Sequence, residues 1–199
     1  MAYNVVHIDS VINLGPAYFF DANLWLKILK PPINLSRRDE KYLSFVERFK
    51  KDPNQPKIII TAFLLSEVIN RYLHDVSYKR FCQKQKQDSP PKSYYKQVYR
   101  VSKDYKNDYI NICDDIDSFS SIFILVSDDL GGKIGLAQIL QSPMLSLDFN
   151  DQYYYLQAKT NGYPIVTDDG DFYVEDVQIL TYNQTLIERV KSAIEIKRP

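Results

Sequence analysis

The chain has 199 residues, of which 45% are hydrophobic, and its 25 basic and 25 acidic residues give a net charge of zero. This size and composition can bury the core of one domain, so we expect a single domain over residues 1–199. The two cysteines, Cys82 and Cys113, are isolated, which argues against a disulfide scaffold or a cysteine zinc site. No apolar run reaches the roughly 18 residues of a membrane span. The N-terminus also lacks a signal-peptide pattern, so we expect a cytoplasmic protein with no membrane partner.

The first part of the chain predicts strands that alternate with helices. The run AYFF at 17–20 is typical of a buried strand, and ANLWLKILK at 22–30 of a helix that ends before two prolines. A second helix is predicted at about 38–51, a strand at 57–61 (KIIIT) and an amphipathic helix at 62–76. Repeated strand and helix units indicate parallel α/β architecture.

Residues 77–117 break this rhythm, since they are polar and rich in Lys, Gln and Tyr. We predict a basic, Tyr-rich helical insertion of two helices joined at Pro90 and Pro91. From Tyr78 to Asn111 the net charge is +6, whereas from Asp114 to Asp176 it is −10. This division suits a polyanion that is held by the basic segment and cut at a metal in an acidic pocket. A solvated helix pair without a ligand is the alternative.

The sheet resumes after the insertion. We predict a strand at 121–127 (SIFILVS), a helix at about 130–140, and a helix within 147–162 that ends at Asn161 and Gly162. Strands follow at 163–167 (YPIVT) and 177–181 (VQILT), with a closing helix at 183–196. The predicted fold is therefore α/β, with a central, mainly parallel sheet flanked by helices.

Acidic residues lie where two predicted strands end. Asp21 follows the first strand, and Asp168 and Asp169 follow a later one. The carboxyl ends of parallel strands share one edge, where ligands bind. Glu67 points away from the apolar stripe of its helix, while Asp151 lies on the less polar face of its own. Crowded carboxylates stay in water or hold a cation; helix capping and turn formation are the structural alternatives.

Three blocks of the sequence resemble the PIN-domain nucleases, which include VapC-like toxins: YFFDANLWL, TAFLLSEVINRYL and DFNDQYYYLQAKTNGYPIVTDDGDF. The resemblance covers Ala17 to about Leu180 in separate blocks and implies one PIN-like domain. By the family's pattern the catalytic, metal-binding acids are Asp21, Glu67, Asp151 and Asp169, and the supporting residues are Asn23, Thr167 and Asp171. Asp148 and Asp168 lie close to two of these acids and remain alternative ligands.

The resemblance implies a metal-dependent endoribonuclease that hydrolyses phosphodiester bonds of single-stranded or structured RNA with Mg²⁺ or Mn²⁺. It further implies a toxin role with an antitoxin partner and a homodimer. The alternative is a non-catalytic PIN-like RNA-binding or scaffold protein in an RNA-processing complex. In the insertion, Lys92, Lys96, Arg100 and Lys103 are the predicted nucleic-acid-binding residues. Its tyrosines either stack on unpaired bases or pack the helices together.

Overall fold

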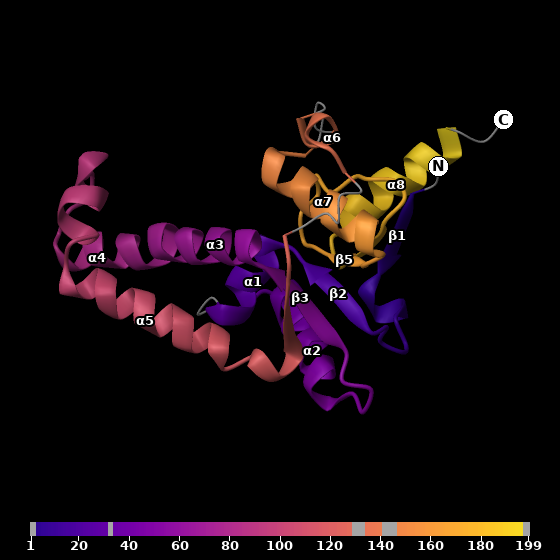
Figure 1. The fold of residues 1–199 in the computed structure, drawn as a ribbon, viewed down its shortest axis with the longest axis horizontal. Coiled ribbons are helices and arrows are strands. Elements are labelled where there is room, and N and C mark those ends of the chain that lie inside the picture. Colours follow the sequence, from indigo (N-terminus) through magenta and orange to yellow (C-terminus); the bar gives the residue numbers. More distant parts are fainter. Residues whose placement is uncertain (1–2, 32–33, 129–133, 141–146, 197–199) are drawn as a thin grey trace. The chain divides into compact units, whose positions relative to one another are not determined.

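The computed structural model describes residues 3–31, 34–128, 134–140 and 147–196. The chain divides into two units, drawn in Figure 1: unit 1 is Met1–Ala62 with Ile122–Pro199, and unit 2 is Phe63–Ser121. The predicted insertion, 77–117, falls inside unit 2. No helix among the residues described is long and apolar enough to cross a membrane.

Unit 1 contains a six-stranded sheet in which every neighbouring pair of strands is parallel. Its strands are β1 (Asn4–His7), β2 (Ala17–Phe20), β3 (Lys57–Thr61), β4 (Phe123–Val126), β5 (Ile165–Val166) and β6 (Gln178–Thr181). Their order across the sheet is β1-β6-β5-β2-β3-β4. The predicted α/β fold with a parallel sheet is confirmed. Strand β1, which pairs with β6, was not predicted, because its four residues include no fully buried side chain.

The helices of unit 1 include α1 (Ala22–Leu29), α2 (Arg37–Lys51), α6 (Leu136–Leu140), α7 (Phe149–Asn161) and α8 (Gln184–Ile196). Their ends follow local signals. Ser36 and Asp39 form a capping box at the start of α2, and Gly162 ends α7 in the left-handed conformation with φ 71°. The helix predicted at about 130–140 is confirmed for 136–140, and its beginning up to residue 133 lies outside the described residues.

Two adjacent side chains of β2 show how the layers form. The ring of Phe19 lies 5.3 Å from that of Tyr154 on α7, whereas the ring of Phe20 lies 5.6 Å from that of Phe49 on α2. Successive side chains of a strand point to opposite faces of its sheet. Helix α7 therefore covers one face and α2 the other, and both phenylalanines are buried.

Unit 2 is helical throughout its secondary structure. Residues 62–84 run without a break through α3 (Ala62–Arg71), the π-helix η2 (Tyr72–Tyr78) and α4 (Lys79–Lys84). The π-helix η3 (Tyr95–Tyr99) and α5 (Lys103–Asp117) follow. The predicted break at the two prolines is present, but a second break precedes α5, where Ser102 caps the new helix.

Tyr99 forms the centre of unit 2. Its side chain is fully buried, and its ring lies 5.0 to 5.5 Å from the rings of four neighbours: Tyr78, Phe81, Tyr95 and Tyr105. Its hydroxyl donates a hydrogen bond of 2.8 Å to Asp108, which also pairs with Arg80. Packing, rather than base stacking, is therefore confirmed as the role of Tyr99.

Candidate functional site

The site lies between β2 and β5, where the strand order of the sheet reverses. From β2 the chain continues to β3 and β4 on one side, and later returns to β5 and β6 on the other side. Strands β2 and β5 are neighbours, with Phe20 opposite Val166. In open parallel sheets such a switch point creates a crevice for ligands at the carboxyl ends of the strands. Asp21 directly follows β2, and Asp169 lies three residues beyond β5.

Thr167 connects these two aspartates. Its hydroxyl donates a hydrogen bond of 2.9 Å to Oδ2 of Asp21 and accepts one of 2.9 Å from the backbone N–H of Asp169. Asp21 is also held by Asn23, whose side-chain amide donates to Oδ2 at 3.2 Å. Thr167 is fully buried, and its two hydrogen bonds hold the segment after β2 and the segment after β5 together. The structure thus brings together four of the predicted site residues: Asp21, Asn23, Thr167 and Asp169.

Asp21 has two roles in the fold. It is the N-cap of α1, accepting a hydrogen bond from the backbone N–H of Asn23 at 3.4 Å, so the capping alternative is confirmed. Its side chain is nevertheless only 2% exposed. Capping alone does not require burial, because an exposed aspartate can cap a helix equally well. Since burial of an ionised carboxylate is costly, the position of Asp21 indicates a further role.

Burial raises the pKa of Asp21 to about 6, and the negative charge of Asp169 raises it as well. Hydrogen bonds from Thr167 and Asn23 act in the opposite direction. Among the described residues, neither Asp21 nor Asp169 has an ion-pair partner. The two carboxylates therefore lie near each other without a protein cation between them, and a proton or a bound cation would relieve their repulsion.

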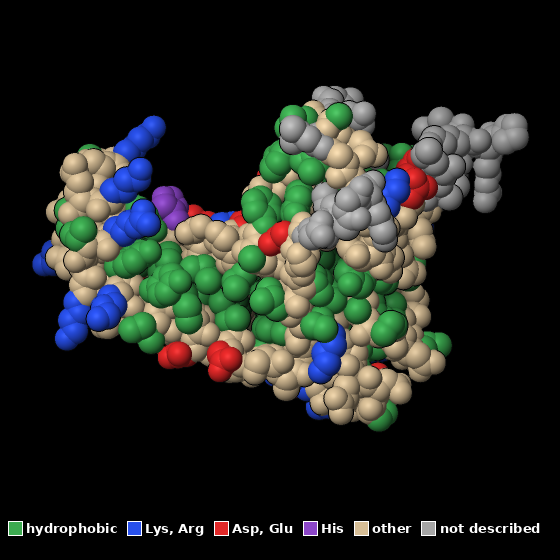
Figure 2. Space-filling model, in the orientation of Figure 1, with side chains coloured by type: hydrophobic (Ala, Val, Ile, Leu, Met, Phe, Trp, Pro, Cys, Tyr) green, Lys and Arg blue, Asp and Glu red, His purple; other side chains and the backbone are tan. Residues whose placement is uncertain are grey.

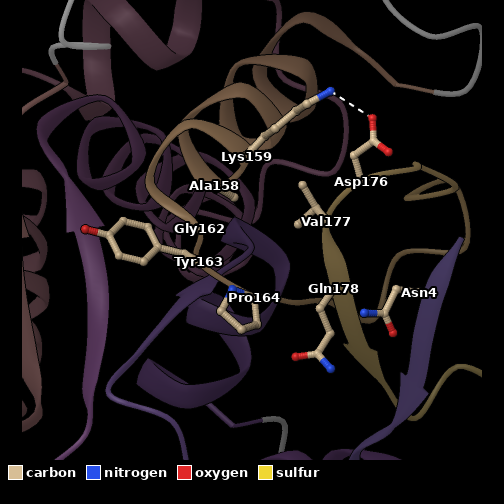
Figure 3. Close-up of a pocket in the computed structure, with 9 residues that line it drawn as sticks. All are labelled: Asn4, Ala158, Lys159, Gly162, Tyr163, Pro164, Asp176, Val177 and Gln178. Atoms are coloured by element: carbon tan, nitrogen blue, oxygen red, sulfur yellow. Dashed lines mark hydrogen bonds and ion pairs between the residues drawn. The ribbon is translucent and has the colours of Figure 1, made fainter. Parts of the chain in front are cut away.

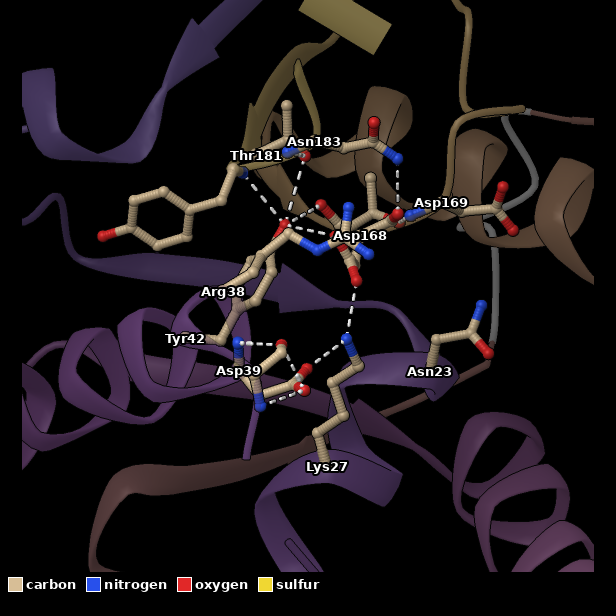
Figure 4. Close-up of polar contacts among 12 residues, drawn as sticks. Asn23, Lys27, Arg38, Asp39, Tyr42, Asp168, Asp169, Thr181 and Asn183 are labelled. Carbon is tan, nitrogen blue, oxygen red and sulfur yellow. Dashed lines mark hydrogen bonds and ion pairs between the residues drawn. The ribbon is translucent and has the colours of Figure 1, made fainter. Parts of the chain in front are cut away.

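Asp168 has a different environment from its neighbour Asp169. Its carboxylate lies 2.6 Å from Nζ of Lys27 and 3.2 Å from Nε of Arg38, and its side chain is 8% exposed. Figure 4 shows Asp168 directed toward these cations and Asp169 directed away from them. Lys27 also pairs with Asp39 at 2.6 Å. Asp168 is thus neutralised by the protein, which makes it a poor candidate for a metal ligand.

Tyr42, on α2, contacts the turn after β5 through its hydroxyl. Its hydroxyl donates to the backbone oxygen of Thr167 at 2.9 Å and accepts from the backbone N–H of Tyr182 at 2.9 Å. Asn183 adds a bond of 2.8 Å from its side-chain amide to the backbone oxygen of Asp168. Burial raises the pKa of Tyr42, so it stays protonated as a donor. Tyr42, Asn183 and Lys27 were not among the predicted site residues. For Lys27 the sequence does contain a signal, because a charge within the apolar run LWLKIL needs a partner.

The contacts given for the other predicted acids are local ones. Asp151 is the third residue of α7, is half-buried, and its backbone N–H donates to Asp148, the N-cap, at 3.0 Å. Asp171 is exposed, and its backbone N–H donates to Oδ1 of Asp169 at 2.8 Å. Glu67 belongs to α3 of unit 2, where it lies 3.5 Å from Arg71. The roles predicted for Asp151, Asp171 and Glu67 stay predictions.

The carboxylates present fit a hard divalent cation to a limited extent. Within residues 3–31, 34–128, 134–140 and 147–196, no group of three His, Cys, Asp or Glu side chains is arranged to hold a metal ion. Mg²⁺, however, is commonly bound through one or two carboxylates together with several waters. Asp21 and Asp169 supply such a pair, and the raised pKa of Asp21 reflects a site that favours added positive charge.

A cavity at the opposite edge of the sheet is a weaker candidate. Figure 3 shows this cavity of about 250 Å³, which lies beside the first residues of β1 and β6 and the turn before β5. An ion pair of 3.1 Å between Lys159 and Asp176 lies on its wall. Ligands of open parallel sheets bind at the carboxyl ends of the strands rather than at this edge.

Comparisons with known proteins show a likeness in structure and none in sequence. No protein-family model matches the chain, and no curated protein matches its sequence. The chain is similar in structure to VapBC2 from Rickettsia felis bound to a DNA fragment from their promoter, with a TM-score of 0.47 and 14% sequence identity. The match covers 82% of this chain and 96% of that one. A likeness of this degree assigns no activity to the chain.

Proposed function

We propose that the protein is a metal-dependent endoribonuclease of the PIN-like type. The observation that carries the proposal is the pair Asp21 and Asp169, joined through Thr167 at the switch point between β2 and β5. Paired carboxylates of this kind suit Mg²⁺ or Mn²⁺. The resemblance to PIN-domain nucleases in the surrounding sequence gives the same reaction class, and its implied toxin role, antitoxin partner and homodimer belong to this proposal.

In this mechanism Asp21 and Asp169 would hold the cation. Once bound, the cation would polarise the scissile phosphate, neutralise developing charge and help to form hydroxide from water. Thr167 directs its proton at Oδ2 of Asp21, whereas Oδ1 accepts only the longer capping bond of 3.4 Å from the backbone N–H of Asn23 and keeps a lone pair for the cation. Asn23 donates to the same Oδ2 atom and thereby fixes the plane of the carboxylate. The protein's own part is thus to orient two carboxylates and to keep Asp21 away from bulk water.

Binding of manganese tests the metal site directly. Crystals soaked in Mn²⁺ should show anomalous density beside Asp21 and Asp169, because these two carboxylates lack a protein cation among the described residues. The Asp169→Asn variant should lose that density, and Glu47→Gln, which changes an exposed acid of α2, should keep it. Density that is absent, or that lies beside Asp168 instead, would rule out the proposed pair.

The basic side chains of unit 2 are the proposed nucleic-acid contacts. Lys92, Lys96, Arg100 and Lys103 are all exposed. Figure 2 shows Lys and Arg side chains gathered over the end of unit 2 that carries α4. Backbone phosphates are held largely by such cations, and binding then weakens as salt rises. Exposed tyrosines are not required for this interaction.

The Lys96→Ala/Arg100→Ala variant should bind single-stranded RNA more weakly, and the slope of log affinity against log salt should become shallower by about 0.7 for each phosphate that is no longer bound. Fluorescence anisotropy between 50 and 200 mM salt, about the range over which such slopes are usually read, measures this slope. Lys191→Ala, which removes an exposed charge from α8, is the matched control. Equal slopes for both variants would remove these residues from the interface.

A non-catalytic RNA-binding or scaffold protein is the second candidate. The observation that favours it is that no three-residue metal-binding group is found among the described residues. The two candidates differ in one measurement. If purified protein binds RNA yet leaves it intact at millimolar Mn²⁺, the scaffold role is the better description.

A further inference from the structure

A second cavity lies at the same edge of the sheet as Asp21 and Asp169. It has a volume of about 430 Å³ and is lined by His7, Arg37, Arg38, Lys41 and Tyr182. His7 ends β1 and is paired in register with Thr181, the last residue of β6. Tyr182 follows β6, and the three cations come from the first turns of α2. All five residues belong to unit 1.

No carboxylate belongs to the lining of this cavity, although Asp9 contacts Lys41 and Tyr182 and Asp168 contacts Arg38. Arg37 is exposed and has no ion pair with any residue in the described part of the chain. Arg38 uses Nε for its contact with Asp168, and its side chain is half exposed. Its two terminal amino groups make no hydrogen bond among the residues that the structure describes. Arginine presents its nitrogens in a planar fork that matches the oxygens of a phosphate.

Lys41, His7 and Tyr182 also line the cavity, and all three contact Asp9. The Nζ atom of Lys41 lies 3.1 Å from Asp9 and 4.9 Å above the ring of Tyr182. Tyr182 donates to Asp9 at 2.8 Å, and these contacts lower the pKa of Asp9, with the Tyr182 hydrogen bond as the largest cause. The backbone N–H of Asp9 donates to Nδ1 of His7 at 3.3 Å. A neutral His7 therefore carries its proton on Nε2, as a donor.

The start of α2 contributes side chains rather than its backbone dipole to this cavity. Ser36 accepts a hydrogen bond from the backbone N–H of Asp39 at 3.1 Å, and Asp39 accepts one from the backbone N–H of Ser36 at 3.3 Å. The capping box therefore uses two of the backbone donors at this helix end. An anion in the cavity would be held by the cationic side chains.

The cavity is connected to the candidate site by short contacts. Arg38 reaches Asp168, which precedes Asp169 in the chain. On the other wall, the backbone N–H of Tyr182 bonds to Tyr42, whose hydroxyl bonds to the backbone of Thr167. We propose that the cavity binds a backbone phosphate of the RNA strand whose neighbouring phosphate is cut at Asp21 and Asp169, an inference that rests on the proposed function. An RNA strand that extends from the acidic pair would place its next phosphate among these cationic side chains. Their attraction would offset the repulsion between the RNA phosphates and the carboxylates of Asp21 and Asp169.

The test is RNA binding in the absence of cleavage. A short fluorescent single-stranded RNA is titrated with protein in EDTA, and its anisotropy is followed at several salt concentrations. Arg37→Ala should weaken binding by roughly 3- to 10-fold and make the salt slope shallower by about 0.7, as expected when one phosphate is no longer neutralised. Lys51→Ala, an exposed charge at the other end of α2, should change neither quantity. Circular dichroism checks that both variants fold.

Each outcome bears on one proposal. If Arg37→Ala binds RNA as tightly as Lys51→Ala, or if the wild type binds no RNA, the phosphate site is overturned. If a poly-glutamate peptide binds in an Arg37-dependent way and RNA does not, the RNA assignment is overturned in favour of an acidic protein. If Arg37-dependent RNA binding holds but the wild type never cleaves with Mn²⁺, the phosphate site stands and the nuclease fails. Asp169→Asn should keep this binding while losing cleavage.

Discussion

Asp21→Asn should make the metal-free protein more stable at pH 7.5 by about 1 to 2 kcal/mol and should abolish Mn²⁺-dependent cleavage. The pKa of Asp21 is raised from 3.8 to about 6 by burial first and by Asp169 second. At pH 7.5 the folded protein therefore holds an ionised carboxylate that is costly to bury, at most about 3 kcal/mol. Asparagine removes that charge and can still cap α1. Part of the gain is lost because the amide accepts fewer hydrogen bonds.

The dependence of this gain on pH gives a second check. A carboxyl group with a raised pKa in the folded state carries no penalty below about pH 3.8, where it is protonated in both states. The penalty grows as pH rises and is complete above about pH 6. The stability difference between Asp21→Asn and wild type, measured by urea unfolding in EDTA, should therefore be large at pH 7.5 and small near pH 4. A difference independent of pH would show that the charge of Asp21 is not its cause.

Mn²⁺ should reverse the order of stability. A cation bound only to the folded state stabilises it by about 2.7 kcal/mol at 100 times its dissociation constant. The wild type should gain melting temperature as Mn²⁺ is added, while Asp21→Asn gains little and cleaves RNA at least about 100-fold more slowly. Glu47→Gln should match the wild type in both measurements, since its side chain is exposed on α2, where it pairs with Lys50. Normal cleavage by Asp21→Asn would remove this residue from the metal site.

The parts of the fold that were predictable rest on local signals. The strands AYFF and KIIIT are short apolar runs followed by amphipathic helices, and the structure has β2 and β3 there. The position of Asp21 and Asp169 at one edge followed from two strand ends in a parallel sheet. The π-helices in unit 2 could not be predicted in the same way, because the apolar spacing of 62–76 fits an ordinary helix.

The ion network beside the site was not predictable, because its contacts join distant parts of the chain. Lys27 and Asp168 are 141 residues apart, and Tyr42 and Asp168 are 126 apart. No periodicity or motif marks such pairs. The adjacent aspartates 168 and 169 look alike in sequence, and only the packing of α1 and α2 against the turn distinguishes them. The resemblance to the PIN-domain pattern favoured Asp169 as the metal ligand. The neutralisation of Asp168 by two cations gives an independent physical reason for the same choice.

The two adjacent aspartates should therefore have opposite effects when each is changed to asparagine. Asp168→Asn leaves half-exposed Arg38 without its ion pair and Lys27 with Asp39 as its remaining partner, and should lower the free energy of unfolding by about 1 to 2 kcal/mol. Asp169→Asn removes no ion pair in the described part of the chain and relieves repulsion on Asp21, so stability should hold or rise. Cleavage should be lost in Asp169→Asn.

Urea unfolding in EDTA and cleavage of a labelled single-stranded RNA separate these effects. A double-mutant cycle of Asp168→Asn with Lys27→Met isolates the ion pair, and should give a coupling of about 1 kcal/mol or more because the contact of 2.6 Å is mostly shielded from water. Asp168→Asn should recover cleavage where it is folded, for instance at low temperature. The opposite result, in which Asp169→Asn unfolds and Asp168→Asn is stable but inactive, would reverse the two roles. Asp168 would then be the metal ligand, despite its ion pairs with Lys27 and Arg38, and Asp169 would be the structural residue.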